Sequence, residues 1–397
     1  LIFLNHMRMN TLLRVLAAAA LLAACGGEKV IGPPPAPVAT QLSMATQPSA
    51  AAQSGAPLAA QPSIRLRDAN GIVVAKSGVV VTATSTGALI LTNAAATTDA
   101  NGTATFSGLT LTGLVGGYTL TFSATALTGV SSNAITLSAG AASQLVVTTQ
   151  PSALSPAGVT LAQQPVIQLR DVSGNDAAQA AVTVTATLVS GTATVGNQAA
   201  VTSASGSAAF AGLSLSGTVG SYTLRFTASG LTQADAAAPT ALVAGPATQL
   251  ALTTPPSASA PNGAALATQP VIQLRDAFGN NAPQAGAIVV ASVVSGPAGS
   301  VIAGDSAATN ASGAAAFSGL KLTGLVGNYG LRFAASGFSS IVGATALTPG
   351  AAAKLGITTA PNSDPQSGIA FTTQPVVQVQ DASGNAVAQA GLVVRAS

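Results

Sequence analysis

Residues Gln164–Asp171 have the sequence QPVIQLRD and are followed by VSGN at positions 172–175. Three further copies of this motif begin at Gln61 (QPSIRLRDANG), Gln269 (QPVIQLRDAFGNN) and Gln374 (QPVVQVQDASGN). The four copies start 103, 105 and 105 residues apart. A fixed period of this size indicates one folding unit that is repeated in tandem.

Side chains alternate within the motif. We expect Ile167 and Leu169 to face one side of a strand, and Gln168 and Arg170 the other, because period two is typical of a half-buried strand. The proline after the first glutamine suits the start of a strand, where the ladder needs no N–H. The closing Asp-x-x-Gly at 171–174 predicts a turn, since Asp bonds nearby backbone N–H groups and glycine tolerates positive φ.

The rest of each repeat predicts an all-β chain of tandem sandwiches. We expect complete repeats at residues 41–142, 143–247 and 248–353, and a truncated fourth repeat at 354–397. A β-branched run such as 182–187 follows the motif, and the last strand carries Tyr222, Leu224 and Phe226 on its inner face. Short strands at regular spacing with turn signals between them predict antiparallel β-sandwiches.

Three motifs together resemble those of bacterial immunoglobulin-like domains of the invasin/intimin type. They are V-I-Q-L-R-D-x-x-G-N, G-x-A-x-F-x-G-L and G-x-Y-x-L-x-F, and the resemblance covers residues 41–397. It implies tandem immunoglobulin-like sandwiches, and the motifs are specific to this fold class more than to a function. The chain departs from the invasins because it has no tryptophan and no recognisable lectin-like tip.

The N-terminal segment predicts export. Residues 1–24 match a lipoprotein signal peptide, with a helix-forming apolar run at 15–24 that follows two arginines and ends in small residues. This run is shorter than the about 20 apolar residues of a membrane-spanning helix. The first six residues fit the pattern poorly, so we expect the true start to be Met7 or Met9.

Leu22-Ala23-Ala24-Cys25 resembles the lipobox of bacterial lipoproteins. The resemblance implies cleavage before Cys25 and acylation of its thiol and new amino group, which makes Cys25 the predicted lipidation site. Several acyl chains anchor a protein stably, whereas one binds a membrane only marginally. The alternative is an ordinary secretory signal followed by an unrelated cysteine. Glycine at position 26, where inner-membrane retention would need aspartate, resembles sorting to the outer membrane.

Residues 25–40 predict a lipidated cysteine followed by a tether. Its prolines are Pro33, Pro34, Pro35 and Pro37. Such a sequence favours extended polyproline geometry, a semi-rigid spacer of ~3.1 Å per residue. We therefore expect the tether to lift the first repeat off a lipid surface at the outer membrane or cell surface.

Composition excludes several classes of function. Charged residues make up 6% of the chain and hydrophobic residues 48%, which is not the composition of a disordered protein. Without residues 1–24 the chain carries 11 basic and 10 acidic residues, so no basic patch for nucleic acid is expected. Cys25 and His6 are the only residues of their kinds, which excludes internal disulfides, Cys/His zinc sites and Cys/His catalysis. We expect no cofactor.

Two sets of repeated polar residues are candidate binding sites. The motif aspartates, Asp68, Asp171, Asp276 and Asp381, are candidate calcium ligands, but the sequence favours turn-forming residues because each copy offers too few oxygens for ~6–8 ligands. The tyrosines Tyr118, Tyr222 and Tyr329 are candidate sugar-stacking residues, but the sequence favours buried rings with bonded hydroxyls.

No catalytic residue is predicted. The other carboxylates of the repeats lie outside the motif turn and are scattered singly along the sequence. They are Asp99, Asp176, Asp235, Asp305 and Asp364. A glycosidase needs two facing carboxyl groups ~5–10 Å apart, and nothing in this spacing predicts such a pair. An active site usually occurs once, whereas scaffold positions such as the motif aspartate recur in every unit.

The sequence therefore predicts a non-enzymatic, surface-anchored stalk of tandem domains that serves adhesion or structural spacing. Its predicted partners are a membrane, through the lipid anchor, and a protein or glycan surface ligand of unknown identity. One alternative is a spacer that carries a catalytic or ligand-binding module beyond Ser397. Another is sugar binding by loops at one end of each sandwich.

The fourth repeat ends inside the strand that corresponds to 288–294. It lacks counterparts of Phe317, Tyr329 and Phe333, which supply most aromatic core residues of the third repeat. So short a chain rarely buries enough apolar surface to fold alone. We expect residues 354–397 to be disordered or loosely docked on the third repeat.

Overall fold

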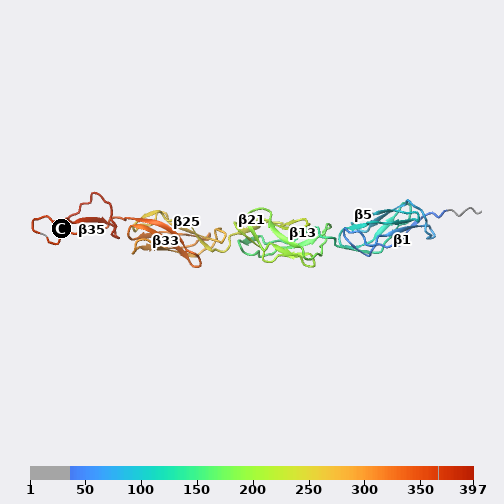
Figure 1. The fold of residues 1–397 in the computed structure, drawn as a ribbon, viewed down its shortest axis with the longest axis horizontal. Coiled ribbons are helices and arrows are strands. Elements are labelled where there is room, and N and C mark those ends of the chain that lie inside the picture. Colours follow the sequence, from blue (N-terminus) through green and yellow to red (C-terminus); the bar gives the residue numbers. More distant parts are fainter. Residues whose placement is uncertain (1–35, 365) are drawn as a thin grey trace, which may run out of the picture. The chain divides into compact units, whose positions relative to one another are not determined.

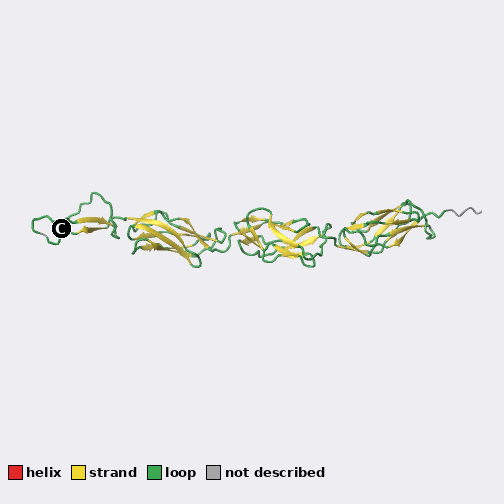
Figure 2. Cartoon of the chain, in the orientation of Figure 1, coloured by secondary structure: helices red, strands yellow, loops and turns green. Residues whose placement is uncertain are grey.

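The computed structural model describes residues 36–364 and 366–397, and every regular element in these ranges is a β-strand (Figures 1 and 2). The predicted signal peptide, Cys25 and most of the tether lie outside the described residues. Two compact units are present, one formed by most of the first repeat and one by Ser138–Ser397 together with Gln53–Gly55 and Gly113–Val115. No helix capable of spanning a membrane occurs in the described part of the chain.

In the third repeat, two sheets enclose the core. Its strands are β25 (Gln249–Thr254), β26 (Ser259–Pro261), β27 (Val271–Arg275), β28 (Ile288–Ser295), β29 (Val301–Ala303), β30 (Ser306–Ala308), β31 (Ala314–Ala316), β32 (Lys321–Thr323), β33 (Gly327–Ala335) and β34 (Ile341–Thr348). One sheet has the order β25-β27-β31 and the other β26-β34-β33-β28-β30, with a separate β29–β32 pair. Ile272 and Leu274 from the first sheet share one core cluster with Leu331 and Phe333 from the second.

The first and second repeats build the same layers from shorter strands. The first contains β1 (Gln41–Thr46), β2 (Ala51–Gln53), β3 (Ser63–Arg67), β4 (Val80–Ser85), β5 (Ile90–Thr92), β6 (Ala95–Thr97), β7 (Thr103–Thr105), β8 (Thr110–Thr112), β9 (Gly116–Tyr118), β10 (Leu120–Ser123), β11 (Val130–Ser131) and β12 (Ile135–Ser138). The second contains β13 (Gln144–Thr149), β14 (Leu154–Pro156), β15 (Val166–Arg170), β16 (Thr183–Leu188), β17 (Thr194–Gly196), β18 (Ala199–Val201), β19 (Ser207–Ala209), β20 (Ser214–Ser216), β21 (Gly220–Tyr222), β22 (Leu224–Thr227), β23 (Ala234–Asp235) and β24 (Thr240–Val243). The prediction of an all-β fold of tandem sandwiches is confirmed.

The repeated motif forms the central strand of its sheet. In the second repeat β15 pairs antiparallel with β13 on one side and with β19 on the other (β13 is labelled in Figure 1). Ile167 and Leu169 are fully buried, as the period of two predicts. Each side chain enters the core because alternate residues of a strand point to the same face.

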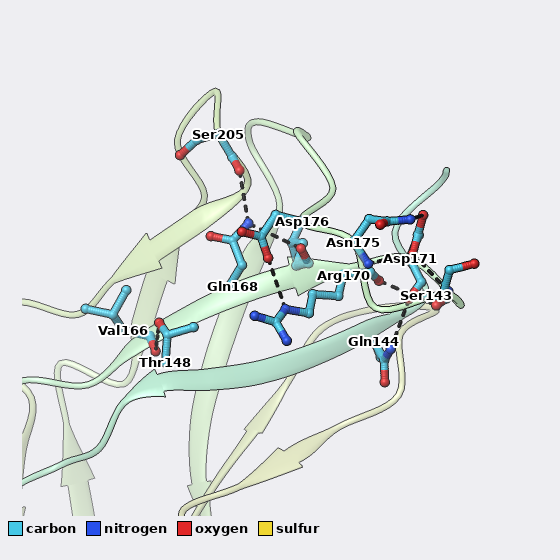
Figure 3. A network of polar contacts seen from close by, with 12 residues as sticks. Ser143, Gln144, Thr148, Val166, Gln168, Arg170, Asp171, Asn175, Asp176 and Ser205 are labelled. Atoms are coloured by element: carbon cyan, nitrogen blue, oxygen red, sulfur yellow. Dashed lines mark hydrogen bonds and ion pairs between the residues drawn. The ribbon is translucent and has the colours of Figure 1, made fainter. Parts of the chain in front are cut away.

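Gln168 corrects the expectation that the second face of this strand is exposed. Its side chain is only 8% exposed, because the turn that contains Ser205 covers it. The Gln168 Nε2 group donates to the carbonyl oxygens of Ser205 at 3.0 Å and Leu169 at 3.2 Å (Figure 3). Gln273 makes the same bonds in the third repeat. A buried amide is tolerated here because its donors are satisfied.

One strand pair in each of the second and third repeats is parallel, beside the antiparallel pairs that the sequence predicts. β14 pairs in parallel with β24, and β26 pairs in parallel with β34. Pro151 and Pro256 lie between the opening strand of each repeat and this short parallel strand. Because proline cannot donate to a ladder, the chain leaves the first sheet there and crosses to the second.

An aromatic pair occupies each core. Phe210 and Phe226 have ring centroids 5.5 Å apart in the second repeat, and the other repeats contain Phe106–Phe122 at 5.2 Å and Phe317–Phe333 at 5.4 Å. Phe226 is fully buried, whereas Thr223 and Arg225 of the same strand region are half-buried. The predicted alternation of the last strand is confirmed in this repeat.

Within the described residues of 354–397, β35 (Lys354–Thr359) and β36 (Val376–Gln380) form one hairpin. The two strands pair antiparallel, but no second layer covers Leu355 and Ile357, which are 51% and 66% exposed. Asp381 and Asn385 of the turn after β36 are nevertheless buried. Asp381 accepts hydrogen bonds from the N–H of Gly350, in the linking segment, and from the side chain of Asn262, which follows β26. Asp381 and Asn385 therefore contact the third repeat, which is the docking expected as one of two alternatives for residues 354–397.

Candidate functional site

The turn after the motif strand holds a buried carboxylate. In the second repeat, Asp171 follows β15, is 1% exposed, and accepts at Oδ1 from the backbone N–H groups of Ser173 and Asn175, both at 2.9 Å. Its Oδ2 accepts from Nδ2 of Asn175 and from the N–H of Gly140, both at 2.8 Å (Figure 3 labels Asp171 and Asn175). The first pair of bonds is the predicted Asx turn, which is confirmed.

The same arrangement recurs in the third repeat. Asp276 accepts at Oδ1 from the N–H groups of Phe278 and Asn280 at 2.9 Å. Its Oδ2 accepts from Asn280 Nδ2 at 2.8 Å and from the N–H of Gly245 at 2.9 Å. The carboxylate therefore ties its own turn to the segment that links the second repeat to the third.

The fourth copy has one donor more. Asp381 accepts from the N–H groups of Ser383 and Asn385, from Asn385 Nδ2, and from the N–H of Gly350. The Nδ2 group of Asn262 adds a further bond at 2.8 Å. All these donors are neutral amides, so the charge is stabilised by hydrogen bonds without a salt bridge.

These bonds argue against calcium binding at Asp171 and Asp276. A carboxylate offers about four lone-pair sites, and four N–H donors occupy those of Asp171 and of Asp276. N–H groups present the positive ends of their dipoles, which repel a cation. Within the described ranges, no group of three or more His, Cys, Asp or Glu residues could hold a metal.

The hydrogen bonds also lower the pKa of Asp171, Asp276 and Asp381. Burial of Asp276 favours its neutral form, but the bonds donated by the Asn280 side chain and by Gly245, Asn280 and Phe278 outweigh it, so the pKa lies below its usual value. The pKa of Asp171 and that of Asp381 are lowered by the same balance. Each aspartate is therefore ionised in the folded protein at neutral pH.

This shift predicts a loss of stability in acid. Because the folded pKa of Asp276 is lower than the unfolded value of about 3.9, its contribution is present above about pH 4 and is lost as pH falls through the folded pKa. We expect Asp276→Asn to be less stable than the parent at pH 7 and the two to converge in acid. Melting temperatures measured from pH 7 to pH 2 test this, and parallel curves would contradict it.

The tyrosines are core residues in two of the three repeats. Tyr222 and Tyr329 are 8% and 1% exposed, and their hydroxyls donate to the carbonyl oxygens of Thr218 at 2.9 Å and Leu325 at 2.7 Å. Burial raises the pKa of Tyr329. Tyr118 is half-buried. The core interpretation is confirmed for Tyr222 and Tyr329, whose ring faces are not available for stacking on a sugar.

Three of the scattered carboxylates have local partners. Asp176 pairs with Arg170 at 3.0 Å, and Asp235 forms a bidentate pair with Arg225 at 2.7 and 2.8 Å. Asp99 accepts from the N–H groups of Asn101 and Thr103, and these bonds lower its pKa. Each of these three contacts is local to its repeat. Asp305 is half-buried and Asp364 exposed.

The asparagine that follows the motif glycine has a role that the sequence pattern does not predict. Asn175, Asn280 and Asn385 lie four residues after the motif aspartate, and the first repeat has Ile72 there instead. Their recurrence was visible in the sequence, but as part of a turn signal. Their buried hydrogen bonds depend on segments about 60 residues away, which no local pattern indicates.

No protein-family model matches the chain, and neither does any curated protein. Among solved structures, the Escherichia coli adhesin FdeC is similar at 18% identity with a TM-score of 0.34, over 80% of this chain and 99% of that one. Invasin, a bacterial integrin-binding protein, is similar at 16% identity with a TM-score of 0.29, over 80% and 61%. The D00–D0 domains of intimin are similar at 20% identity with a TM-score of 0.26, over 51% and 98%. The repeat motifs resemble the invasin/intimin type, and these likenesses concern the fold.

Proposed function

We propose that this chain is a non-enzymatic array of immunoglobulin-like domains that is anchored at a bacterial surface and serves adhesion or structural spacing. The observation that carries the proposal is repetition: the aromatic pair recurs in all three complete repeats and the buried aspartate in the second, third and fourth copies. The recurring aspartates and aromatic residues make their contacts within the fold. Such an array supplies length and surface.

The proposed anchor is the lipid attached to Cys25, and the proposed address is the outer membrane or cell surface. The resemblance of residues 22–25 to a lipobox supports the anchor, and glycine in place of aspartate at position 26 supports the outer membrane. The exposed polar faces of the sandwiches are the surface on which a protein or glycan ligand would bind.

Protease treatment of intact cells tests the proposed display. The complete chain is produced in a bacterial host with an outer membrane, and antibodies against the third repeat follow its digestion by added protease. We expect digestion on intact cells, while a periplasmic marker protein survives. Digestion that requires a permeabilised envelope would contradict surface display.

Adhesion and spacing are distinguished by deleting residues 143–247, which removes one whole period. For a spacer, we expect normal folding and reduced antibody access to the third repeat on intact cells. For an adhesive surface in the second repeat, we expect lower attachment of cells to immobilised matrix proteins or glycans. A deletion that changes neither measurement would contradict both roles for that repeat.

A further inference from the structure

The side chain of Asn280 contacts the second repeat. Its Nδ2 group donates to the carbonyl oxygen of Gly217 at 2.8 Å, and its Oδ1 accepts from the N–H of Val219 at 3.1 Å. The other Nδ2 hydrogen goes to Asp276. All these atoms belong to the second compact unit. The side-chain amide of Asn280 thus bonds both an N–H and a carbonyl group of one backbone loop, as the backbone of a neighbouring strand would.

The same contact recurs one period later. Asn385 Nδ2 donates to the carbonyl oxygen of Gly324 at 2.9 Å, and the N–H of Val326 donates to Asn385 Oδ1 at 2.9 Å. Both loops have the sequence Gly-x-Val and precede the core tyrosine. The second and third repeats therefore offer the same two backbone groups, the glycine carbonyl and the valine N–H, to the asparagine of the repeat that follows.

The receiving loop is fixed from inside its own repeat. The hydroxyl of Tyr222 bonds the carbonyl oxygen of Thr218, the middle residue of the first loop, and Tyr329 does the same with Leu325 in the second. A buried ring thereby holds the loop in position before the next repeat binds. This preorganisation lowers the entropy lost on docking.

The linking segment adds a steric requirement for glycine. A Cβ atom at Gly245 would lie 2.4 Å from the carbonyl oxygen of Ala157, and one at Gly350 would lie 2.5 Å from that of Asn262. These glycines also donate their N–H groups to the motif aspartates. The close approach of these glycines to a backbone carbonyl, together with their hydrogen bonds to aspartate, requires glycine four residues before the first strand of the following repeat.

The first repeat provides an internal comparison. Asp68 still accepts from the N–H groups of Asn70 at 2.9 Å and Ile72 at 2.8 Å, so the turn forms without the asparagine. Ile72 is 60% exposed, and Pro37 occupies the position of the linker glycine. Proline has no N–H to donate. The asparagine and glycine are therefore not needed for the turn itself.

We propose that the Asp-Asn pair of the motif is a coupling site by which a repeat binds the Gly-x-Val loop of the repeat before it. The partner that fits is a domain of this same type, with its loop held by a core tyrosine. A repeat with isoleucine and proline at these positions folds but does not couple to a predecessor. This proposal stands independently of where the array is displayed.

Spin labels on the second and third repeats test the coupling. Cys25→Ser removes the only natural cysteine, and Val201→Cys and Val301→Cys place labels at sites 59% and 65% exposed. Double electron–electron resonance then measures the distribution of distances between the two repeats. We expect a narrow distribution in this parent protein, and a broad one in the parent would overturn the proposal.

Asn280→Ile is the deciding variant, because the first repeat shows that isoleucine allows the turn to form. Loss of two hydrogen bonds should raise the uncoupled fraction about tenfold or more, seen as a broad component in the distance distribution. Asn310→Ala is the matched control, since Asn310 caps a turn inside the third repeat through the N–H groups of Ser312 and Ala314. It should leave the distribution narrow.

A second variant separates uncoupling from misfolding. Asp276→Asn places an amide N–H against the donors of Gly245 and Asn280, and we expect it to broaden the distribution as well. Amide exchange in β27 and β33 reports whether the third repeat is folded. Broadening while β27 and β33 stay protected supports coupling, whereas a narrow distribution in both variants would overturn it. If the distance distribution broadens only in variants that also lose amide protection, Asp276 and Asn280 serve folding of the third repeat alone. That result would also overturn the proposed coupling.

Discussion

Phe226→Ala is expected to lower the free energy of unfolding of the second repeat by ~3–5 kcal/mol. The ring is fully buried and contacts Phe210 at a centroid distance of 5.5 Å. Its residue pairs with Ala186 of the neighbouring strand β16. A side chain as small as alanine opposite it cannot fill the cavity, so the cost should lie near that of a truncated core aromatic.

Thr223→Ala is the matched control, since Thr223 is half-buried three residues before Phe226. We expect a cost well under ~1 kcal/mol. Because a chain of several domains does not unfold in one step, amide exchange in β16 and β22 measures the two variants within the complete protein. Equal loss of protection in Phe226→Ala and Thr223→Ala would show that the strand does not have the register that buries Phe226, because a shift of one residue exchanges the two faces.

Cys25→Ser is expected to release the protein from membranes almost completely. Cys25 is the only cysteine and the only acyl acceptor that the lipobox resemblance offers. Without acyl chains, the anchor loses ~0.8 kcal/mol for each buried CH₂ group. Partition between detergent and aqueous phases, together with metabolic labelling by a fatty acid, measures both the anchor and its loss.

The substitution lies outside the repeats, so amide exchange in residues 41–353 should match that of the parent. Ala23→Ser, in the same segment, is the control for altered export, because it leaves the acceptor thiol in place. Unchanged partition of Cys25→Ser into the detergent phase would contradict lipidation. Loss of partition in both variants would point to a defect in export.

Local periodicity predicts the strands of this protein well. Ile167 and Leu169 face the core because alternation along a strand is a property of the backbone itself. Gln168 is different: its burial depends on Ser205, which lies 37 residues further along the chain. The parallel pairing of β14 with β24 likewise joins segments that no short pattern connects.

The contacts that couple one repeat to the next are harder still to predict from the sequence of a single repeat. The turn around Asp276 is predictable, because its N–H donors lie two and four residues away. Asn280 instead bonds Gly217, 63 residues earlier and in another repeat. A polar residue four positions after the aspartate has the same local appearance whether or not a neighbouring domain meets it.

The parallel strands also determine how a repeat responds to mechanical force. β14 is near the entry of the chain into the second repeat and β24 is near its exit, and parallel pairing places their incoming and outgoing ends at opposite ends of the ladder. Tension along the chain therefore slides the strands past each other in shear. It stretches the bonds of Ala241 to Ala153 and of Ala157 to Val243 together, and does not open them one by one. Because forced unfolding follows the barrier to unfolding, this geometry raises the resistance of each such repeat to pulling.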